Sequence, residues 1–322
     1  MANDFRTITL THRRNWHPHL YRSRGFRFLL NRCALSLRRK AMDHRKRQLP
    51  RGWYPYDGKD CKRDIESYLE GWSFSQAQSI EGLGGIVPHA GWYFSGKLAA
   101  RVFSSLKLKR KVEVVVLYGG HLSPDHLPLI VTEEKWETPF GDIEVHTEFV
   151  KSLMKKVDTK KESPQSGDNT MEVQLAMVKY FFPEAKLLAL RSPSSARAKE
   201  LGESIAEIAQ KEGISIVAVG STDLTHYGPN YGFVTKGVGP RAVEWVKKEN
   251  DKGFIDRALE MDIEGLLKHA EENDSACSAG AAASAVATCK ALGARKGILL
   301  DYYTSYEIMP DDSFVGYGGI LY

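Results

Sequence analysis

Hydrophobic residues in this chain occur in short, nearly continuous runs, separated by longer segments in which they recur every three or four positions. Four runs end at Val87, Tyr118, Leu190 and Val219. Such runs are typical of strands that are covered on both faces of a sheet. The segments 60–72 and 196–210 have the spacing of helices with one apolar face. The pattern predicts an α/β fold, a single domain with a central, mostly parallel β-sheet flanked by helices.

Two of the predicted strands lead within a few residues to a histidine. Val87 is followed by Pro88-His89, and Tyr118 is followed by Gly119-Gly120-His121. Ligands of open α/β sheets bind beyond the carboxyl ends of the strands. We therefore expect His89 and His121 to lie at one edge of the sheet. One histidine in such a position is more often a core or loop residue, so the inference depends on the matching pair.

A third polar group follows the strand that ends at Val219, in the run Ser-Thr-Asp-Leu-Thr-His-Tyr-Gly of residues 221–228. Asp223 and His226 are three positions apart, so they can share one face of a turn and form a hydrogen bond. Such a bond would fix the imidazole tautomer and raise its basicity. The density of polar residues favours a site over an ordinary loop.

Small residues dominate positions 275–283, which predicts a helix that packs very close to the sheet. Cys277 lies at the N-terminal end of this helix, where the helix dipole lowers the pKa of a thiol. Two imidazoles and one thiolate suit a transition metal with an open coordination position, and the softness of sulfur favours iron, copper or zinc.

Glu172 permits two interpretations. It follows Asn169 by three positions, which is the spacing of a capping box at the start of a helix. The alternative is a catalytic carboxylate. The spacing alone leaves both open.

The charge of the chain is unevenly distributed. Residues 1–50 contain 13 Lys and Arg against 2 Asp and Glu, whereas residues 51–322 contain 32 against 38. We expect residues 1–50 to be a basic, disordered extension and residues 51–322 to be the folded domain. The extension could be an organelle transit peptide, an arm that binds nucleic acid or anionic membranes, or sequence outside the functional protein, with Met42 as the true start.

Composition excludes several classes of protein. No run of 18 apolar residues is present, so we expect no transmembrane helix. Four cysteines among 322 residues do not resemble a disulfide framework and favour a reduced, cytoplasmic setting. The chain contains no Walker loop, no Gly-x-Ser-x-Gly elbow and no dinucleotide fingerprint. We expect no nucleic acid to bind the folded domain.

Taken in order, these motifs resemble the Memo family (AmmeMemoRadiSam system protein B). The resemblance covers about residues 51–322 and rests on Trp53-Tyr54-Pro55, Pro88-His89-Ala90-Gly91, Gly119-Gly120-His121, Thr138-Pro139, Asp168 with Glu172, residues 221–228, Cys277 and Tyr317-Gly318-Gly319. It implies a fold similar to the class III extradiol dioxygenases, a metal held by His89, His121 and Cys277, and a pocket lined by Asp223 and His226. It also implies an association with a radical SAM partner protein.

Three stretches depart from the family pattern. Gly119-Gly120-His121-Leu122 stands where the family often has Gly-Pro-x-His-His, and Asn169 stands at the first position of its His-x-x-Glu. The usual Cys-Gly-x-x-Pro is Cys-Ser-Ala-Gly-Ala at residues 277–281. The missing histidines reduce the groups available for a proton relay, while the three expected metal ligands are retained.

Two functions follow as hypotheses. The first is a metal-dependent oxidoreductase that holds iron or copper, or alternatively zinc, with His226 as acid and base, Asp223 orienting it, and Glu172 as a further catalytic group. Ring cleavage of catechols normally uses two histidines and one carboxylate, so a thiolate in that place predicts weak or absent dioxygenase activity. The alternative is a non-catalytic module that binds a peptide or protein in the same crevice.

Overall fold

The computed structural model of the chain describes residues 43–73, 82–106 and 111–322. The chain divides into two units, residues 1–41 and 42–322, and every described residue belongs to the second. Residues 1–42 of the basic extension, with the three interpretations given for it, lie outside the described residues.

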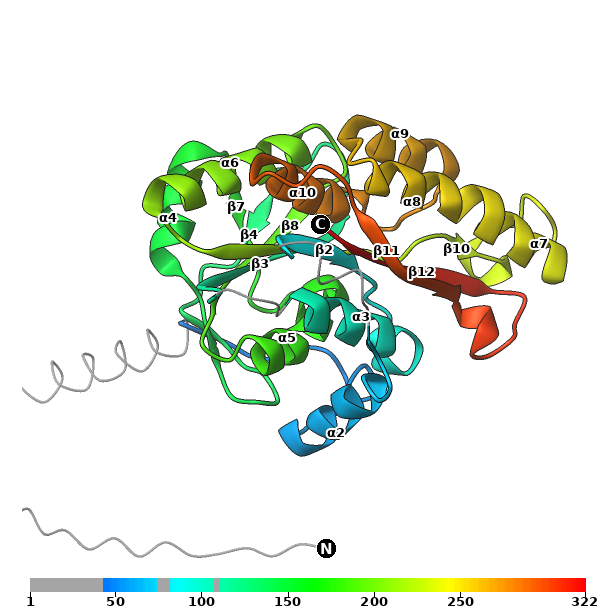
Figure 1. Cartoon of the computed structure of the whole chain (residues 1–322), viewed down its shortest axis with the longest axis horizontal. Helices are drawn as coiled ribbons and strands as arrows, with labels where there is room; N and C mark the ends of the chain where they lie inside the picture. Colours follow the sequence, from blue (N-terminus) through cyan, green and yellow to red (C-terminus); the bar gives the residue numbers. More distant parts are fainter. Residues whose placement is uncertain (1–42, 74–81, 107–110) are drawn as a thin grey trace, which may run out of the picture. The chain divides into compact units, whose positions relative to one another are not determined.

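A nine-stranded sheet forms the centre of the described unit (Figure 1). Its order is β10 (His226–Tyr227), β12 (Phe314–Leu321), β2 (Gly84–Val87), β9 (Ile216–Ser221), β3 (Val114–Leu122), β8 (Lys186–Pro193), β4 (Leu129–Ile130) and β7 (Lys160–Lys161), with β11 (Ile298–Thr304) paired to β12. The adjacent strands β2, β9, β3 and β8 run parallel, and they are the four strands expected from the hydrophobic runs. The α/β prediction is confirmed. The sheet is mixed as a whole, because β12 and β4 pair antiparallel on either side of this centre.

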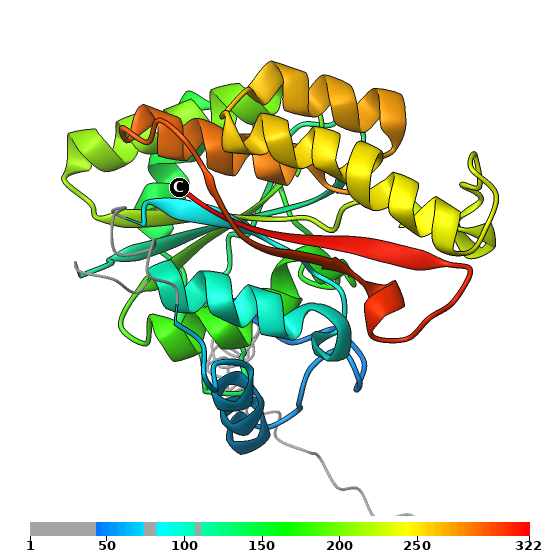
Figure 2. The same ribbon diagram turned by 45° about the vertical axis from the view of Figure 1, so that its right-hand side comes forward.

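Helices cover both faces of the sheet (Figure 2). One face carries α3 (Trp92–Leu106) and α5 (Asn169–Phe181), with α2 (Gly58–Tyr68) outside them. The other carries α6 (Arg197–Glu212) and α10 (Ala279–Ala291), with α4 (Thr147–Lys156) beside α6 and with α8 (Asp251–Leu259) and α9 (Ile263–Asn273) beyond. The short helices are α7 (Pro240–Trp245), the π-helix η3 (Val246–Asn250), and the 3-10 helices η2 (Pro229–Tyr231) and η4 (Ser305–Glu307). None of the helices in the described ranges is long and apolar enough to cross a membrane.

The alanine-rich helix α10 packs directly on the sheet, as its small residues predict. It is buried along almost its whole length. A Cβ atom at Gly220 of β9 would lie 2.6 Å from the carbonyl oxygen of Ala281, so only glycine permits this approach. The close contact brings the first residues of α10 to the edge of the sheet where β9 ends.

Residues 43–50, which we expected to belong to the extension, contact the domain. The strand β1 (His44–Arg45) pairs with β5 (Lys135–Trp136), which pairs with β6 (Ile143–Glu144). Arg45 is 2% exposed and its guanidinium lies 4.3 Å from the ring centroid of Trp136. Cation–π contact stabilises such a buried charge. The basic composition of residues 43–50 therefore does not indicate that this segment packs against the folded domain.

Candidate metal centre

Three neighbouring parallel strands deliver polar side chains to one edge of the sheet. His89 follows β2, Asp223 follows β9, and His121 lies at the end of β3. Cys277 comes from the turn that precedes α10. The ligand atoms of His89, His121 and Cys277 all lie within 4.8 Å of one another, a grouping that could hold a metal ion. The structure thus brings together the three ligands expected from the sequence.

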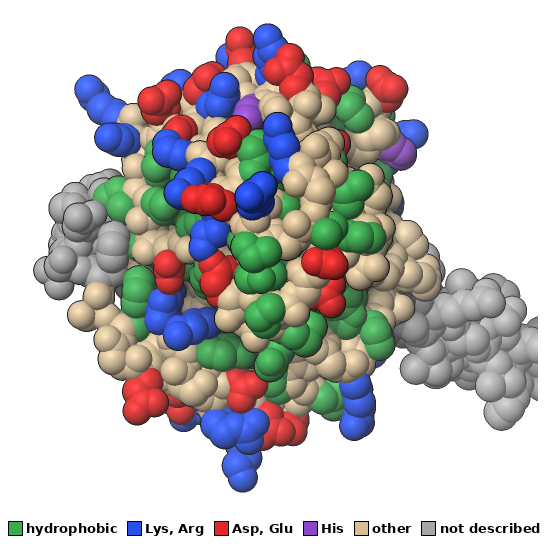
Figure 3. Space-filling model, turned by 90° about the vertical axis from the view of Figure 1, so that its right-hand side faces the viewer, with side chains coloured by type: hydrophobic (Ala, Val, Ile, Leu, Met, Phe, Trp, Pro, Cys, Tyr) green, Lys and Arg blue, Asp and Glu red, His purple; other side chains and the backbone are tan. Residues whose placement is uncertain are grey.

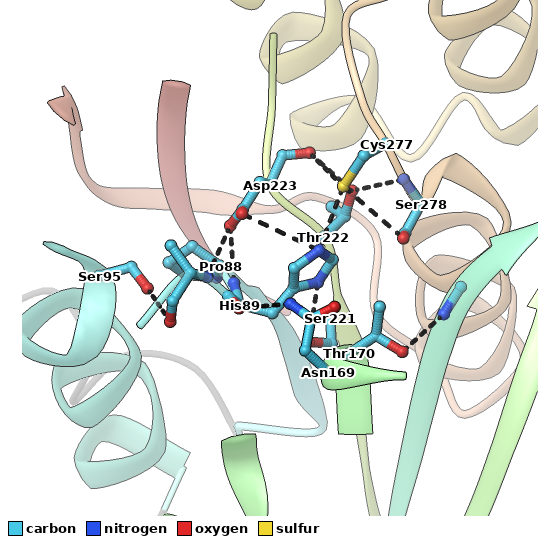
Figure 4. A network of polar contacts seen from close by, with 12 residues as sticks. Pro88, His89, Ser95, Asn169, Thr170, Ser221, Thr222, Asp223, Cys277 and Ser278 are labelled. Carbon is cyan, nitrogen blue, oxygen red and sulfur yellow. Dashed lines mark hydrogen bonds and ion pairs between the residues drawn. The ribbon is translucent and has the colours of Figure 1, made fainter. Parts of the chain in front are cut away.

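Polar contacts fix both the backbone and the ring of His89 (Figure 4). Its backbone N–H donates to Oδ1 of Asp223 at 2.7 Å, and its carbonyl oxygen accepts from Nδ2 of Asn169 at 3.0 Å. Nδ1 of the ring lies 3.3 Å from Oγ of Ser221. These contacts leave Nε2 directed at Sγ of Cys277, 3.2 Å away. A ligand that is fixed before an ion arrives loses little conformational entropy on binding.

His121 is oriented by Asp168. Its Nδ1 lies 3.0 Å from Oδ2 of Asp168, and its ring is nearly perpendicular to that of His89, at 84° and 5.1 Å between centroids. The other oxygen of Asp168 accepts from the backbone N–H of Thr170 and so caps α5. A carboxylate on Nδ1 leaves Nε2 available as the ligand atom, which is the usual arrangement in metal sites.

The thiol of Cys277 and the imidazole and carboxylate groups around it shift one another's pKa values. Burial opposes ionisation of Cys277, yet the nearby imidazoles of His89, His121 and His226 outweigh it and hold the thiol pKa well below its usual range. Burial likewise disfavours protonation of His89, but the negative charges of Cys277 and Asp223 raise its pKa to about 9. Cys277 and Asp168 raise the pKa of His121 to about 10 in the same way. Without a metal ion, these mutual interactions favour the thiolate of Cys277 together with the protonated rings of His89 and His121.

Asp223 and His226 lie close together, although not in the hydrogen bond that their spacing suggested. Oδ2 of Asp223 is 3.9 Å from Nε2 of His226 and 3.9 Å from Nε2 of His89, which is ion-pair distance. Burial raises the pKa of Asp223. Within the described part of the chain, Nε2 of His226 is buried and has no hydrogen-bond partner. An unpaired buried polar atom calls for a ligand or water.

Glu172 is neither in the cluster nor in the lining of the crevice. Its carboxylate accepts from the backbone N–H groups of Gln48 and Leu49, at 2.7 and 2.9 Å, and from the hydroxyl of Tyr54 at 3.0 Å. The expectation of a capping box with Asn169 was wrong, since the N-cap of α5 is Asp168. Glu172 instead links residues 48, 49 and 54 to α5 through hydrogen bonds. Its catalytic role stays a prediction.

A crevice of about 450 Å³ opens beside the cluster. Its lining combines aromatic side chains with short polar ones: Trp53, Phe94, Tyr231, Tyr317, Asn169, Asn230, Ser305, Asp311 and Ser313. Tyr231 and Met309 line it while remaining 47% and 54% exposed. Figure 3 shows the molecule from the side of α7 and η4, where hydrophobic and charged side chains both reach the surface. The crevice has room for a small molecule or an extended segment of chain.

Several residues that support the candidate ligands were not predicted from the sequence. Gln174 donates from Nε2 to the carbonyl oxygen of Pro88 at 2.7 Å and lies 3.3 Å from Oγ of Ser221. Asp168 was noted only within the family resemblance. A polar residue in the middle of the apolar helix segment 171–178 was the available signal for Gln174, because a buried amide needs partners.

Comparisons with known proteins found a matching family model and several similar proteins. The family model described as "Memo-like protein" matches residues 45–321. A MEMO1 family protein of Nitrosopumilus maritimus is 35% identical over 256 residues, which cover 77% of this chain and 87% of that protein. A MEMO1 family protein of Methanococcoides burtonii is 28% identical over 273 residues, covering 84% of this chain and 96% of that protein. A crystal structure of an uncharacterised protein from Escherichia coli K12 matches with 15% identity and a TM-score of 0.37, covering 68% of this chain and 91% of that one.

Proposed function

The chain belongs to the Memo family, and from that premise we propose that His89, His121 and Cys277 hold one transition-metal ion for redox or oxygen chemistry. Iron or copper is the proposed ion, with zinc as the alternative, because two imidazoles and a thiolate are ligands that these metals prefer. The mutual spacing of the three ligand atoms, within 4.8 Å, carries the proposal.

The donor set fits such an ion. In a tetrahedral site with metal–sulfur and metal–nitrogen bonds of usual length, sulfur and nitrogen are about 3.5 Å apart. Sγ of Cys277 and Nε2 of His89 are 3.2 Å apart, so this pair would have to separate by only a few tenths of an ångström to reach that spacing. Only three protein ligands converge among the described residues, and catalytic sites typically keep a further position open.

The remaining residues have separable roles. A bound redox-active ion would supply one-electron chemistry and Lewis acidity. His226 would carry a proton at Nε2, which is buried and has no hydrogen-bond partner in the described structure. Asp223 would position both histidines through its contacts to the backbone of His89 and to the ring of His226. With a thiolate in place of a carboxylate ligand, we expect little or no catechol ring cleavage.

Metal analysis tests the proposal. Wild type and Cys277→Ala should be purified anaerobically, reconstituted separately with Fe²⁺, Cu²⁺ and Zn²⁺, and assayed for bound metal. Cys61→Ala is a matched control, because Cys61 is a buried thiol that donates to the carbonyl oxygen of Pro55, away from the cluster. We expect about one metal ion in wild type and in the control, and none in Cys277→Ala. Equal metal in all three proteins would refute the ligand assignment.

A second candidate is the peptide- or protein-binding module, favoured by the aromatic lining of the crevice. Trp53, Phe94, Tyr231 and Tyr317 offer rigid apolar surface with polar edges, which is common in binding surfaces. A synthetic peptide array probed with metal-free protein would test it: binding that is lost in His121→Ala supports this function. Association with a radical SAM partner protein is a further family-based proposal, which co-purification would test.

A further inference from the structure

The strand β3 departs from regular pairing at the residue that carries a candidate ligand. Gly119 pairs with Arg191 of β8, and the next paired residues are Leu122 and Pro193. Two residues of β3, Gly120 and His121, therefore face the single residue Ser192, which makes a β-bulge. His121 adopts a φ of 57°, in the left-handed region that costs energy for any residue with a Cβ atom. Such a conformation persists only where surrounding contacts hold it.

Arg191 supplies those contacts. Its Nε donates to the carbonyl oxygen of Gly120 at 2.8 Å, and its Nη2 donates to the carbonyl oxygen of His121 at 3.0 Å. One guanidinium thus binds both carbonyl groups of the bulge. Nη2 also lies 3.3 Å from Oδ2 of Asp168, the oxygen that contacts Nδ1 of His121.

The environment of Arg191 keeps this arrangement rigid. The side chain is 12% exposed, and Nη1 lies 3.7 Å from Oε1 of Glu162, which is almost completely buried. A planar guanidinium with donors in a fixed fork can bind several acceptors at once, whereas the ammonium group of lysine acts as a point charge. The guanidinium of Arg191 therefore contacts the backbone of His121 directly. It also contacts Asp168, which in turn orients the imidazole of His121.

We propose that Arg191 is a positioning residue of the metal centre, which holds the β3 bulge and Asp168 so that Nε2 of His121 faces Cys277. The inference rests on the proposed metal-binding function. Groups that orient a metal-binding histidine typically contribute about 10- to 100-fold to metal affinity. Arg191 should contribute in that range while touching neither the ion nor a substrate.

The experiment compares Arg191→Met and Arg191→Lys with wild type and with Lys186→Met. Lys186 is a matched control because it lies on the same strand, is half-exposed and pairs with Glu144 at the surface. Three quantities are measured: Cu²⁺ affinity by competition with a chelator, the number of coordinated imidazoles by pulsed EPR of the Cu²⁺-loaded protein, and amide hydrogen exchange of residues 119–122 in metal-free protein.

We expect Arg191→Met to bind Cu²⁺ about 10- to 100-fold more weakly, to coordinate one imidazole instead of two, and to exchange faster at residues 119–122. Arg191→Lys should fall between it and wild type, and it provides the measurement if Arg191→Met does not fold. Lys186→Met should match wild type. Wild-type affinity with two imidazoles in both Arg191 variants would overturn the proposal. If wild type itself binds no metal, the proposed function fails, and hydrogen exchange in metal-free protein still decides whether Arg191 holds the bulge.

Discussion

Sγ of Cys277 lies 3.2 Å from Nε2 of His89, although 188 positions separate the two residues in the chain. One follows a strand in the first third of the chain and the other precedes the last long helix. The contact stabilises a thiolate next to a protonated imidazole, because each charge favours the other. A metal ion that enters this position must therefore replace protons.

Metal affinity should rise with pH. The pKa of His89 is raised to about 9 and that of His121 to about 10, so both rings carry a proton at neutral pH in metal-free protein. A metal ion binds the deprotonated rings, and binding releases up to two protons. We expect apparent affinity to increase between pH 6 and 9, by at most about 100-fold per pH unit. Competition titrations at several pH values would measure this change, and calorimetry in buffers of different ionisation enthalpy would count the protons. An affinity that does not change with pH would contradict the prediction.

Asp223→Ala should be more destabilising than Asp223→Asn. Oδ1 of Asp223 accepts from the backbone N–H groups of His89 and Ala90, at 2.7 and 3.3 Å, inside the protein. Alanine leaves these donors without an acceptor, at a cost of about 2–4 kcal/mol in the free energy of unfolding. Asparagine keeps an acceptor oxygen and should cost less than about half as much. Urea unfolding of metal-free protein measures both, and equal losses would show that the carboxylate charge matters rather than the acceptor.

The edge of the sheet that holds the cluster could be predicted because strand ends are visible in the sequence. His89 and His121 each follow an apolar run, and parallel strands bring their carboxyl ends to one edge. Cys277 precedes a helix instead, and only the alanine-rich residues behind it indicate that this helix lies directly on the sheet. Hydrophobic pattern and residue size thus suffice to place these three groups.

The contacts that orient the ligands could not be predicted, because they depend on how α5 is rotated against β3. An apolar helix segment does not reveal which of its polar residues faces the site. Glu172 illustrates the difficulty. With Asp168 as N-cap, the third helical position is Met171, so Glu172 lies one position beyond the capping-box partner and points toward residues 48 and 49. A shift of one residue in the start of the helix changed its role.

Glu172→Ala should release the segment before Trp53 without affecting metal content. It removes the acceptor of Gln48, Leu49 and Tyr54, which should lower the free energy of unfolding by about 1–3 kcal/mol. Trypsin should then cut faster after Lys46, Arg47 and Arg51. Glu137→Ala is the control, because Glu137 pairs with Lys46 and Arg47 near the surface, where ion pairs contribute little. Loss of metal in Glu172→Ala would instead indicate a link to the cluster.

Asp251→Asn should change how stability depends on pH. Asp251 is fully buried, and burial raises the pKa of its carboxyl group to about 6, although hydrogen bonds from Thr225 and Tyr302 oppose the shift. Between about pH 4 and pH 6 the folded protein therefore binds this proton more tightly than the unfolded chain does. The free energy of unfolding of wild type, relative to the variant, should fall as pH rises through this range and stay constant above it.

The shift from 3.8 to about 6 corresponds to a fall of up to about 3 kcal/mol. Urea unfolding of metal-free wild type and Asp251→Asn at pH 4, 5, 6 and 7 would measure the difference, in which the other titrating groups cancel. Asp256→Asn is the matched control, because Asp256 lies on the same helix, is half-exposed and pairs with Lys252. A difference between wild type and Asp251→Asn that is the same at all four pH values would show that folding does not raise the pKa of this carboxyl group.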